Sequence, residues 1–328
     1  MKKKIHFFFH LIWKDINFYS ILLLPLSLLY LLVFFFKKKL CLFKVKPKSH
    51  TIIIGNINVG GTGKTPLIIE LIRYFKEKNI NVGVISKGYG RKSKKNMFVE
   101  NYHSADVVGD EPLLIKKKTD VKVLVGNSRK KLIHIFEKEN PNLQVLLFDD
   151  GLQDNSFFHD TDIVMFDGEK LFGNRLLIPA GPLRELFHGL KKYDFLVSKK
   201  SSKELNNFPY SYCSIKTYLK FAINFTTNEK KNLSIFDEKN INLVTGIGNP
   251  ESFYLSLKKF NFKIEKHFFP DHHNFEEKDF KLNNSYPIFV SEKDAVKLQF
   301  KIDNLWVIPM FLNCEKKLLD NLLDRLYI

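Results

Sequence analysis

The stretch that decides the fold is TIIIGNINVGGTGKTPLIIELIRYF, residues 51–75. An apolar run enters a glycine-rich turn, the turn ends in Gly-Lys-Thr, and a helical pattern follows. A strand, such a loop and a helix in this order predict a phosphate-binding loop (P-loop) of the Walker A type, because backbone N–H groups and the helix N-terminus converge on phosphate oxygens. A glycine-rich turn without a ligand is the alternative. The loop alone leaves open whether the phosphate serves work on another protein, regulation or transfer to a substrate.

Two residues of the loop have expected contacts of their own. Lys64 is expected to reach the β- and γ-phosphates, and Thr65 to offer its hydroxyl to Mg²⁺. The other residues expected around the phosphates are Asn58, Gly60, Gly61, Thr62 and Gly63. Asn58 stands where the first glycine of this motif is usual. Because asparagine tolerates a positive φ better than most residues, we expect the loop to survive this exchange.

Two carboxylates follow a second apolar strand, VLLFDDG at residues 145–151. This is the Walker B position, where an aspartate at the carboxyl end of a strand meets Mg²⁺ directly or through water. Either Asp149 or Asp150 could be the closer ligand. Alone, such a pair is more often a solvated turn, but together with a Walker A loop it indicates a metal site.

Two further polar motifs are candidates for acid–base chemistry. VVGDEPLLI contains Asp110 and Glu111, and transfer of a phosphoryl group to an alcohol needs a carboxylate or histidine that accepts the hydroxyl proton. The alternative is an exposed acidic turn. FPDHHNF contains Asp271, His272 and His273; an Asp–His acid–base partner is favoured there over a metal site, since adjacent strand residues face opposite sides.

Two shorter motifs carry weaker signals. SKGYGRKSKK, residues 86–95, is basic and interrupted by glycines, which suits phosphate or lipid headgroups, although it could equally be a solvated loop. SEKDAVK begins with Ser291 and has Asp294 three residues later, which is a helix-capping pattern.

Composition sets the class of protein and of partner. The chain has 328 residues, with 52 Lys and Arg against 35 Asp and Glu, a net charge of +17. Such a surplus suits an anionic partner, either nucleic acid or an anionic membrane. Cys41, Cys213 and Cys314 form no CxxC pair, so neither a disulfide framework nor a zinc site is indicated, and a reducing cytoplasm fits.

The N-terminal segment favours the membrane. INFYSILLLPLSLLYLLVFFF, residues 16–36, carries no charge and as one helix would reach about 30 Å, roughly a bilayer core. A signal peptide lacks support because no small-residue cleavage site follows, and a buried helix is the other alternative. Whether the segment spans the bilayer or lies in one leaflet stays open. Both flanks are basic: Lys2, Lys3 and Lys4 before it, and Lys37, Lys38 and Lys39 after it.

The rest of the chain alternates between strand and helix patterns. Continuous apolar strands such as NVGVIS, VKVLVG, DIVMFD and DFLVSK lie between helical segments, which predicts an α/β fold with a parallel sheet covered by helices on both faces. A smaller C-terminal α/β unit follows a polar, ribbon-like linker. The predicted divisions are a membrane-associated helix and linker at 1–48, a P-loop domain at 49–200, the linker at 201–236, and the C-terminal domain at 237–328.

Taken together, the motifs resemble one family. GNINVGGTGKTP, SKGYGR, GDEP, DDGLQ, FGNRLLIPAGPLRE, TGIGNPESF, FPDHHNF and SEKDAVK occur in this order. The set is similar to that of the tetraacyldisaccharide 4'-kinases of lipid A biosynthesis, from the N-terminal helix to about residue 300. The resemblance implies a P-loop NTPase-like enzyme on the cytoplasmic face of a bacterial inner membrane. It would use ATP and Mg²⁺ to phosphorylate the 4'-hydroxyl of a tetraacyldisaccharide 1-phosphate, and it implies no nucleic-acid partner.

The resemblance also implies roles for single residues. Asp110 would be the base, assisted by His272. Asp149 and Asp150 would serve Mg²⁺, with Glu111 and Gln153 close by. Arg129 and Arg184 would contact phosphates. Lys87 stands where the family usually has arginine, which puts a phosphate contact there in doubt, and Ser291 replaces a usual threonine.

Two other classes of protein are weighed against this kinase. A membrane-anchored regulatory GTPase would be expected to carry an NKxD motif, and the sequence has none. A nucleic-acid-binding protein would use the basic surface, but the charge is dispersed along the chain and no RNP-like or zinc-finger pattern accompanies it.

Overall fold

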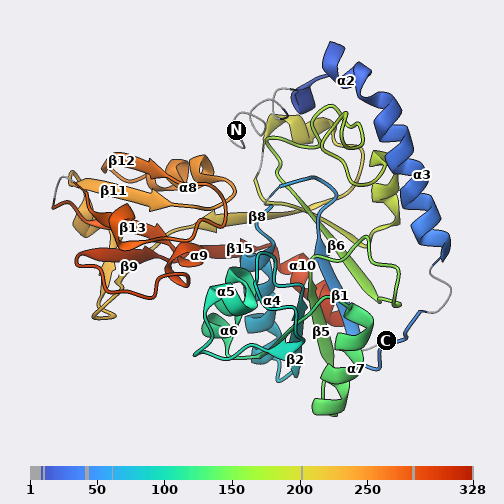
Figure 1. Cartoon of the computed structure of the whole chain (residues 1–328), viewed down its shortest axis with the longest axis horizontal. Coiled ribbons are helices and arrows are strands. Elements are labelled where there is room, and N and C mark those ends of the chain that lie inside the picture. The colour runs from blue at the N-terminus through green and yellow to red at the C-terminus, as the bar shows by residue number, and fades with distance from the viewer. Residues whose placement is uncertain are drawn as a thin grey trace. The chain divides into compact units, whose positions relative to one another are not determined.

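The computed structural model describes residues 9, 12–40, 44–60, 62–200, 202–282 and 285–326 (Figure 1). Gly61, Cys41 and the lysines at positions 2–4 lie outside the described residues. The chain forms two compact units: the first comprises Met1–Ser86, Ser128–Lys216 and Cys314–Ile328, and the second comprises Lys87–Asn127 and Thr217–Asn313. Residues 87–127, which the sequence pattern places in the P-loop domain, therefore group with most of the C-terminal half.

The first unit is built on a parallel sheet with strand order β8-β7-β6-β1-β5-β2. β1 lies in the middle and pairs in parallel with β5 on one side and β6 on the other. The strands are β1 (His50–Gly55), β2 (Val82–Ser86), β5 (Val145–Asp149), β6 (Thr161–Phe166), β7 (Phe195–Ser198) and β8 (Cys213–Tyr218). The predicted α/β class with a parallel sheet is confirmed.

Burial explains why these strands read as continuous apolar runs. Ile52, Ile53 and Ile54 of β1 are fully buried, as expected for a parallel strand with both faces covered. Helix α4 (Lys64–Glu77) packs against β1, β2 and β5, and α7 (Arg129–Glu139) packs against β2. Gly83 permits this close approach, since a Cβ there would lie 2.2 Å from Cζ of Phe136. Coverage of both faces by helices stays a prediction.

The second unit contains a six-stranded mixed sheet with order β10-β9-β14-β13-β11-β12. β11, β12, β13 and β14 pair in parallel with one another, while β9 is antiparallel to β10 and β14. Phe236, Phe253, Phe289 and Trp306 form its aromatic core. The strands are β9 (Phe221–Asn224), β10 (Lys230–Asn232), β11 (Asn240–Thr245), β12 (Lys263–Phe268), β13 (Ile288–Ser291) and β14 (Leu305–Ile308).

Shorter elements complete both units. The second unit also contains an antiparallel pair formed by β3 and β4, and helix α6, which packs against the short helix α9. Apart from the N-terminal helices and short 3-10 turns, the other described strands and helices are β3 (Met97–Phe98), β4 (Lys122–Val125), β15 (Phe311–Cys314), α5 (Ala105–Val108), α6 (Asp110–Thr119), α8 (Pro250–Leu257), α9 (Glu292–Ala295) and α10 (Lys316–Asp324).

The N-terminal apolar segment forms two helices, α2 (Phe18–Leu22) and α3 (Leu24–Leu40), so the uninterrupted helix predicted over residues 16–36 is wrong. Pro25 is the physical reason, because it lacks an N–H and is tolerated only in the first turn of a helix. Within the described part of the chain, none of the helices combines the length and apolar content that crossing a bilayer requires.

Helix α3 is attached to the first unit by hydrogen bonds to one loop. The Ser27 hydroxyl donates to the carbonyl of Leu177 (2.8 Å) and accepts from the N–H of Ala180 (3.1 Å). The Tyr30 hydroxyl donates to the carbonyl of Arg184 (2.9 Å). Large apolar side chains on α2, α3 and the residues before them remain exposed, among them Ile16, Phe18, Leu22, Leu28, Leu29 and Phe36.

A buried carboxylate joins β11 to α9 in the second unit. Asp294 is fully buried, and its side chain accepts hydrogen bonds from the Thr245 hydroxyl (2.7 Å), the Gly246 N–H (3.2 Å) and the Ser291 hydroxyl (2.7 Å). The Lys297 ammonium pairs with it at 2.7 Å. Ser291 also caps α9 by accepting from the Asp294 N–H, which confirms the predicted helix start.

We predict that Asp294→Ala destabilises the second unit by about 3–5 kcal/mol, because it leaves the Lys297 charge buried without its partner. The chain has two tryptophans, so in a Trp13→Phe background the fluorescence of Trp306 alone follows urea unfolding of this unit. The control is Asp303→Ala, which removes an exposed carboxylate and should change stability by at most about 0.5 kcal/mol. Equal midpoints for the two variants would contradict the prediction.

Candidate active site

The P-loop after β1 adopts the conformation that its glycines allow. Gly60 and Gly63 have positive φ, 115° and 84°. Asn58 is not among the residues with positive φ, so its expected tolerance of that conformation is not used. Instead its side-chain amide donates to the carbonyl of Leu171 at 2.8 Å, which anchors the start of the loop.

Asn56 holds the same loop from inside. This fully buried side chain donates to the carbonyls of Asn58 (2.7 Å) and Gly60 (3.0 Å). Its oxygen accepts from the Lys64 ammonium at 3.2 Å. Sequence reasoning missed Asn56, although a polar residue directly after a buried apolar strand was the available signal.

The two carboxylates of the Walker B segment lie next to the P-loop because β5 pairs with β1, with Asp149 opposite Ile54. Asp149 is buried and accepts from the Ser86 hydroxyl at 3.0 Å. Asp150 has a positive φ of 59°. Its carboxylate lies 4.0 Å from the Lys64 ammonium and 3.3 Å from the Arg184 guanidinium. The structure therefore brings Lys64, Asp150 and Arg184 together. Their expected contacts with phosphates and Mg²⁺ stay predictions.

The oxygen atoms of the side chains that follow β1 and lie at the end of β5 fit Mg²⁺. One carboxylate oxygen of Asp150, Oδ1, is buried and has no hydrogen-bond partner among the described residues. Mg²⁺ prefers carboxylate and hydroxyl oxygens together with waters and phosphates. Thr65, Asp149 and Asp150 would hold the ion, and these assignments stay predictions.

Arg129 and Gln153 make contacts within the protein. Buried Arg129 donates to the Asp154 carboxylate (2.9 Å) and to the Asp150 carbonyl, so it orders the turn after β5. The Gln153 amide donates to Glu185 at 2.8 Å. Their expected contacts with phosphates stay predictions.

Two residues near the P-loop were missed by sequence reasoning. Glu185 is buried and accepts from Gln153, from the Lys192 ammonium (2.6 Å) and from the Tyr193 hydroxyl (2.8 Å). Lys199 follows β7, and its ammonium lies 3.5 Å from the position of a Cβ built on Gly63. Burial lowers the pKa of Lys199. Glu185 is the last residue of the FGNRLLIPAGPLRE motif, which was the available signal, whereas Lys199 belongs to no motif whose spacing would have marked it.

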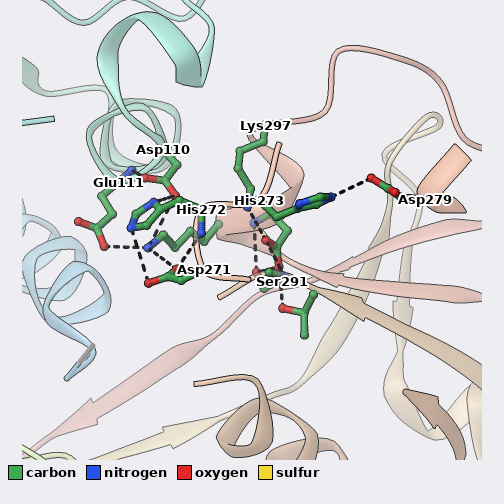
Figure 2. Close-up of polar contacts among 12 residues, drawn as sticks. Asp110, Glu111, Asp271, His272, His273, Asp279, Ser291 and Lys297 are labelled. Atoms are coloured by element: carbon green, nitrogen blue, oxygen red, sulfur yellow. Dashed lines mark hydrogen bonds and ion pairs between the residues drawn. The ribbon is translucent and has the colours of Figure 1, made fainter. Parts of the chain in front are cut away.

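The second unit contains a separate polar group, here called the acid–histidine cluster: Asp110, Glu111, Asp271, His272 and Lys293. Asp110 is the first residue of α6, and its carboxylate lies 2.9 Å from Nδ1 of His272 (Figure 2). His272 follows β12 in the left-handed region, with φ of 58°, which histidine adopts more readily than most residues. The pairing of Asp110 with His272 agrees with their predicted partnership.

The pKa shifts of Asp110 and His272 both favour the charged form of the side chain. Burial alone would raise the pKa of Asp110, but the hydrogen bond to His272 and the charge of Lys293 hold it below its usual range. The hydrogen bond to Asp110 raises the pKa of His272, although burial and Lys293 oppose this. An ionised carboxylate beside imidazole is the arrangement that accepts a proton from an alcohol.

Lys293, the second residue of α9, lies among the carboxylates of the cluster. Its ammonium is 3.0 Å from Glu111, 3.6 Å from Asp110 and 3.7 Å from Asp271. Sequence reasoning took SEKDAVK only as a helix start, so this contact was missed.

His273 makes different contacts from those of the adjacent His272. Figure 2 shows His273 turned toward Asp279, to which its Nε2 lies at 2.9 Å. Its ring stacks on Phe269 and meets Phe275 edge-on. The two adjacent histidines therefore divide into one packed side chain and one member of the cluster.

The basic loop after β2 is ordered by its own arginine. The Arg91 guanidinium donates to the carbonyls of Lys87 (3.0 Å) and Lys95 (2.6 Å) and to the Asn127 side chain (3.1 Å). Arg91 thus fixes the loop conformation, and contact of this loop with phosphates or headgroups stays a prediction.

Comparison with known proteins identifies the group to which this site belongs. The family model described as tetraacyldisaccharide-1-P 4'-kinase matches residues 19–327. A tetraacyldisaccharide 4'-kinase from Ruthia magnifica subsp. Calyptogena magnifica is 37% identical over 310 residues, which is 93% of this chain and 95% of the relative. One from Haemophilus influenzae (strain 86-028NP) is 38% identical over 297 residues, 88% of this chain and 87% of the relative.

A solved structure has the same fold. The crystal structure of LpxK from Aquifex aeolicus in complex with ATP matches with a TM-score of 0.76 and 27% identity, over 94% of this chain and 99% of that chain. The match of the family model to nearly the whole sequence, together with these relatives, shows that the chain belongs to the tetraacyldisaccharide-1-P 4'-kinase family.

Proposed function

We propose that the protein is an ATP-dependent kinase of lipid A biosynthesis that transfers the γ-phosphate to the 4'-hydroxyl of a tetraacyldisaccharide 1-phosphate. Family membership over residues 19–327 supports the substrate, and the Aquifex aeolicus LpxK structure, which holds ATP, supports the nucleotide. The observation that carries the proposal within this chain is the Asp110–His272 pair at 2.9 Å, in a protein that also has a P-loop.

On the donor side, the P-loop backbone and Lys64 would bind the phosphates of ATP. Mg²⁺, when bound, would neutralise charge on the phosphate oxygens, with Thr65, Asp149 and Asp150 as its protein ligands. Arg184, 3.3 Å from Asp150, would offer a second cation for phosphate oxygens. Asn56 would keep Lys64 and the loop in position through its hydrogen bonds to both.

On the acceptor side, Asp110 would accept the proton of the 4'-hydroxyl as the oxygen attacks the γ-phosphorus. His272 would hold the Asp110 carboxylate in one orientation through its Nδ1 contact. Phosphoryl transfer depends mainly on positioning and electrostatics, because little covalent chemistry falls to the protein. A base that is already ionised and fixed by a hydrogen bond suits that requirement.

We further propose that α2 and α3 attach the enzyme to the cytoplasmic face of the inner membrane. Contiguous exposed apolar side chains mark interaction surfaces, and these helices expose Phe18, Leu22, Leu28, Leu29 and Phe36. A lipid acceptor resides in such a surface, and the net charge of +17 suits anionic headgroups. No nucleic-acid partner is proposed.

The decisive experiment is an acceptor assay. Purified protein in detergent should transfer labelled phosphate from ATP to a tetraacyldisaccharide 1-phosphate. Asp110→Asn should lower kcat by about 100-fold or more while ATP still binds, since general base catalysis contributes roughly 10²–10⁴-fold. Lys64→Ala should instead weaken ATP binding. ATP turnover that is independent of the lipid would indicate a regulatory NTPase, and full activity of Asp110→Asn would exclude the base assignment.

Asn56→Ala should weaken ATP binding by a factor of about 5–150, because hydrogen bonds worth roughly 1–3 kcal/mol support the loop. Isothermal titration calorimetry measures the affinity. Asn81→Ala is the matched control, since Asn81 is an exposed asparagine of the same unit whose side-chain amide donates to the carbonyl of Asn142. Unchanged affinity in a folded Asn56→Ala protein would show that the loop needs no such support.

The double variant Leu28→Ser and Leu29→Ser should bind vesicles of anionic lipid at least about 10-fold more weakly, because each buried leucine contributes roughly 1.5–3 kcal/mol. Co-sedimentation measures the binding. Ile235→Ser removes an equally exposed side chain from the second unit and should leave vesicle binding unchanged. Equal binding by the double variant would place the membrane contact elsewhere.

A further inference from the structure

We propose that Lys293 is a positioning residue for the Asp110–His272 pair. Its ammonium pairs with the surrounding carboxylates and balances their charge. The Asp110 carboxylate thereby stays ionised and oriented to accept the proton of the acceptor hydroxyl. The inference rests on the proposed function of that pair. It gives the lysine of SEKDAVK a chemical role in the reaction, although Lys293 itself does not contact the substrate.

The contacts of the ammonium carry the proposal. Lys293 Nζ lies 3.0 Å from Glu111, 3.6 Å from Asp110 and 3.7 Å from Asp271, and only 19% of its side chain is exposed. A lysine ammonium has three donors and no acceptor. Here three carboxylates surround it, so its charge is directed into the cluster. Lys64, by contrast, hydrogen-bonds to the neutral Asn56 side chain at 3.2 Å and lies 4.0 Å from the Asp150 carboxylate.

The backbone around Lys293 is held in place by the contacts of its two neighbours in the chain. Lys293 lies between Glu292, which pairs with Lys118 of α6, and Asp294, whose buried carboxylate ties α9 to β11. The carboxylates around its ammonium come from two other segments: Asp110 and Glu111 begin α6, and Asp271 follows β12. Lys293 therefore connects three chain segments, α9, the start of α6 and the turn after β12, next to the proposed catalytic base Asp110.

The charge balance shows what its removal would do. The charged groups that act on Asp110 are His272, Lys293 and Lys297, and the carboxylates that act on Lys293 are Glu111, Asp110 and Asp271. Without Lys293, three carboxylates would share one imidazole and the more distant Lys297, which is already paired with Asp294. Because Lys293 lowers the pKa of both Asp110 and His272, its loss raises both, and Asp110 would be protonated at a higher pH.

The test compares Lys293→Met and Lys293→Arg with wild type in the full chain, using kcat/KM for the lipid acceptor as a function of pH. The acid limb should move up by about one to three pH units in Lys293→Met, as expected for loss of an adjacent opposite charge. Activity should approach that of wild type at alkaline pH, and the KM for ATP should change by less than about 2-fold. Lys293→Arg keeps the charge and should restore most of the acid limb.

The matched control is Lys278→Met, an exposed lysine of the same unit that pairs with Glu276 and should leave the profile unchanged. A loss of activity in Lys293→Met by the same factor at every pH would overturn the proposal, because it would indicate a direct phosphate contact or a purely structural role. An unaltered profile would also overturn it.

A second readout needs no turnover. Two-dimensional NMR of protein with labelled histidine, assigned with His272→Gln, should show that the His272 ring titrates at higher pH in Lys293→Met than in wild type. An unchanged titration in a protein with unchanged thermal stability would contradict the inference. Failure of the proposed function itself is distinguishable, since wild type would then transfer no phosphate while the NMR titration would still report on Lys293.

Discussion

Parallel strand pairing is the constraint on which both functional clusters depend. In a parallel sheet the carboxyl ends of neighbouring strands meet at one edge, where ligands bind in open α/β folds. In the first unit, β1 and β5 end side by side, which places the P-loop beside Asp149 and Asp150. In the second unit, β11 and β12 end together at Thr245 and Phe268, and β13 runs parallel to β11. The turn that contains His272 follows β12, and helix α9, which contains Lys293, follows β13.

Charge pairing then sets the chemistry at each edge. In the first unit, the contacts of Lys64 and Arg184 with Asp150 are long enough, at 4.0 and 3.3 Å, to yield to phosphate oxygens. In the acid–histidine cluster the contacts are more numerous, and two of them, Asp110 with His272 at 2.9 Å and Glu111 with Lys293 at 3.0 Å, are shorter. Removing one partner of a buried pair is costly. The two clusters therefore differ as their proposed roles require. In the first unit, Lys64 and Arg184 are available to bind phosphate. In the acid–histidine cluster, Lys293 keeps the Asp110 carboxylate ionised.

The sequence predicts most of this architecture and only part of the site. The long apolar runs identify the buried strands. The motifs GKT, DDG, GDEP and DHH mark Lys64, the pair of Asp149 and Asp150, Asp110 and His272 as candidates, and the family resemblance implies the roles of Asp110 and His272. Asn56 directly follows a buried strand, and Glu185 and Lys293 lie within PAGPLRE and SEKDAVK, but their roles depend on contacts that only the folded chain creates. The break between α2 and α3 follows from Pro25, whose missing N–H outweighs the apolar character of the segment around it.

The attachment of α3 connects the proposed membrane contact with the phosphate-binding residues. Ser27 and Tyr30 face the protein and hydrogen-bond to the loop between Leu177 and Arg184, while the leucines of the opposite face remain exposed. The backbone carbonyl that accepts from Tyr30 belongs to Arg184, whose guanidinium contacts Asp150. A helix seated on a bilayer would thus hold, through one hydrogen bond, the residue proposed to contact phosphate. An acceptor whose acyl chains stay in the membrane would then meet a cation already fixed relative to that surface.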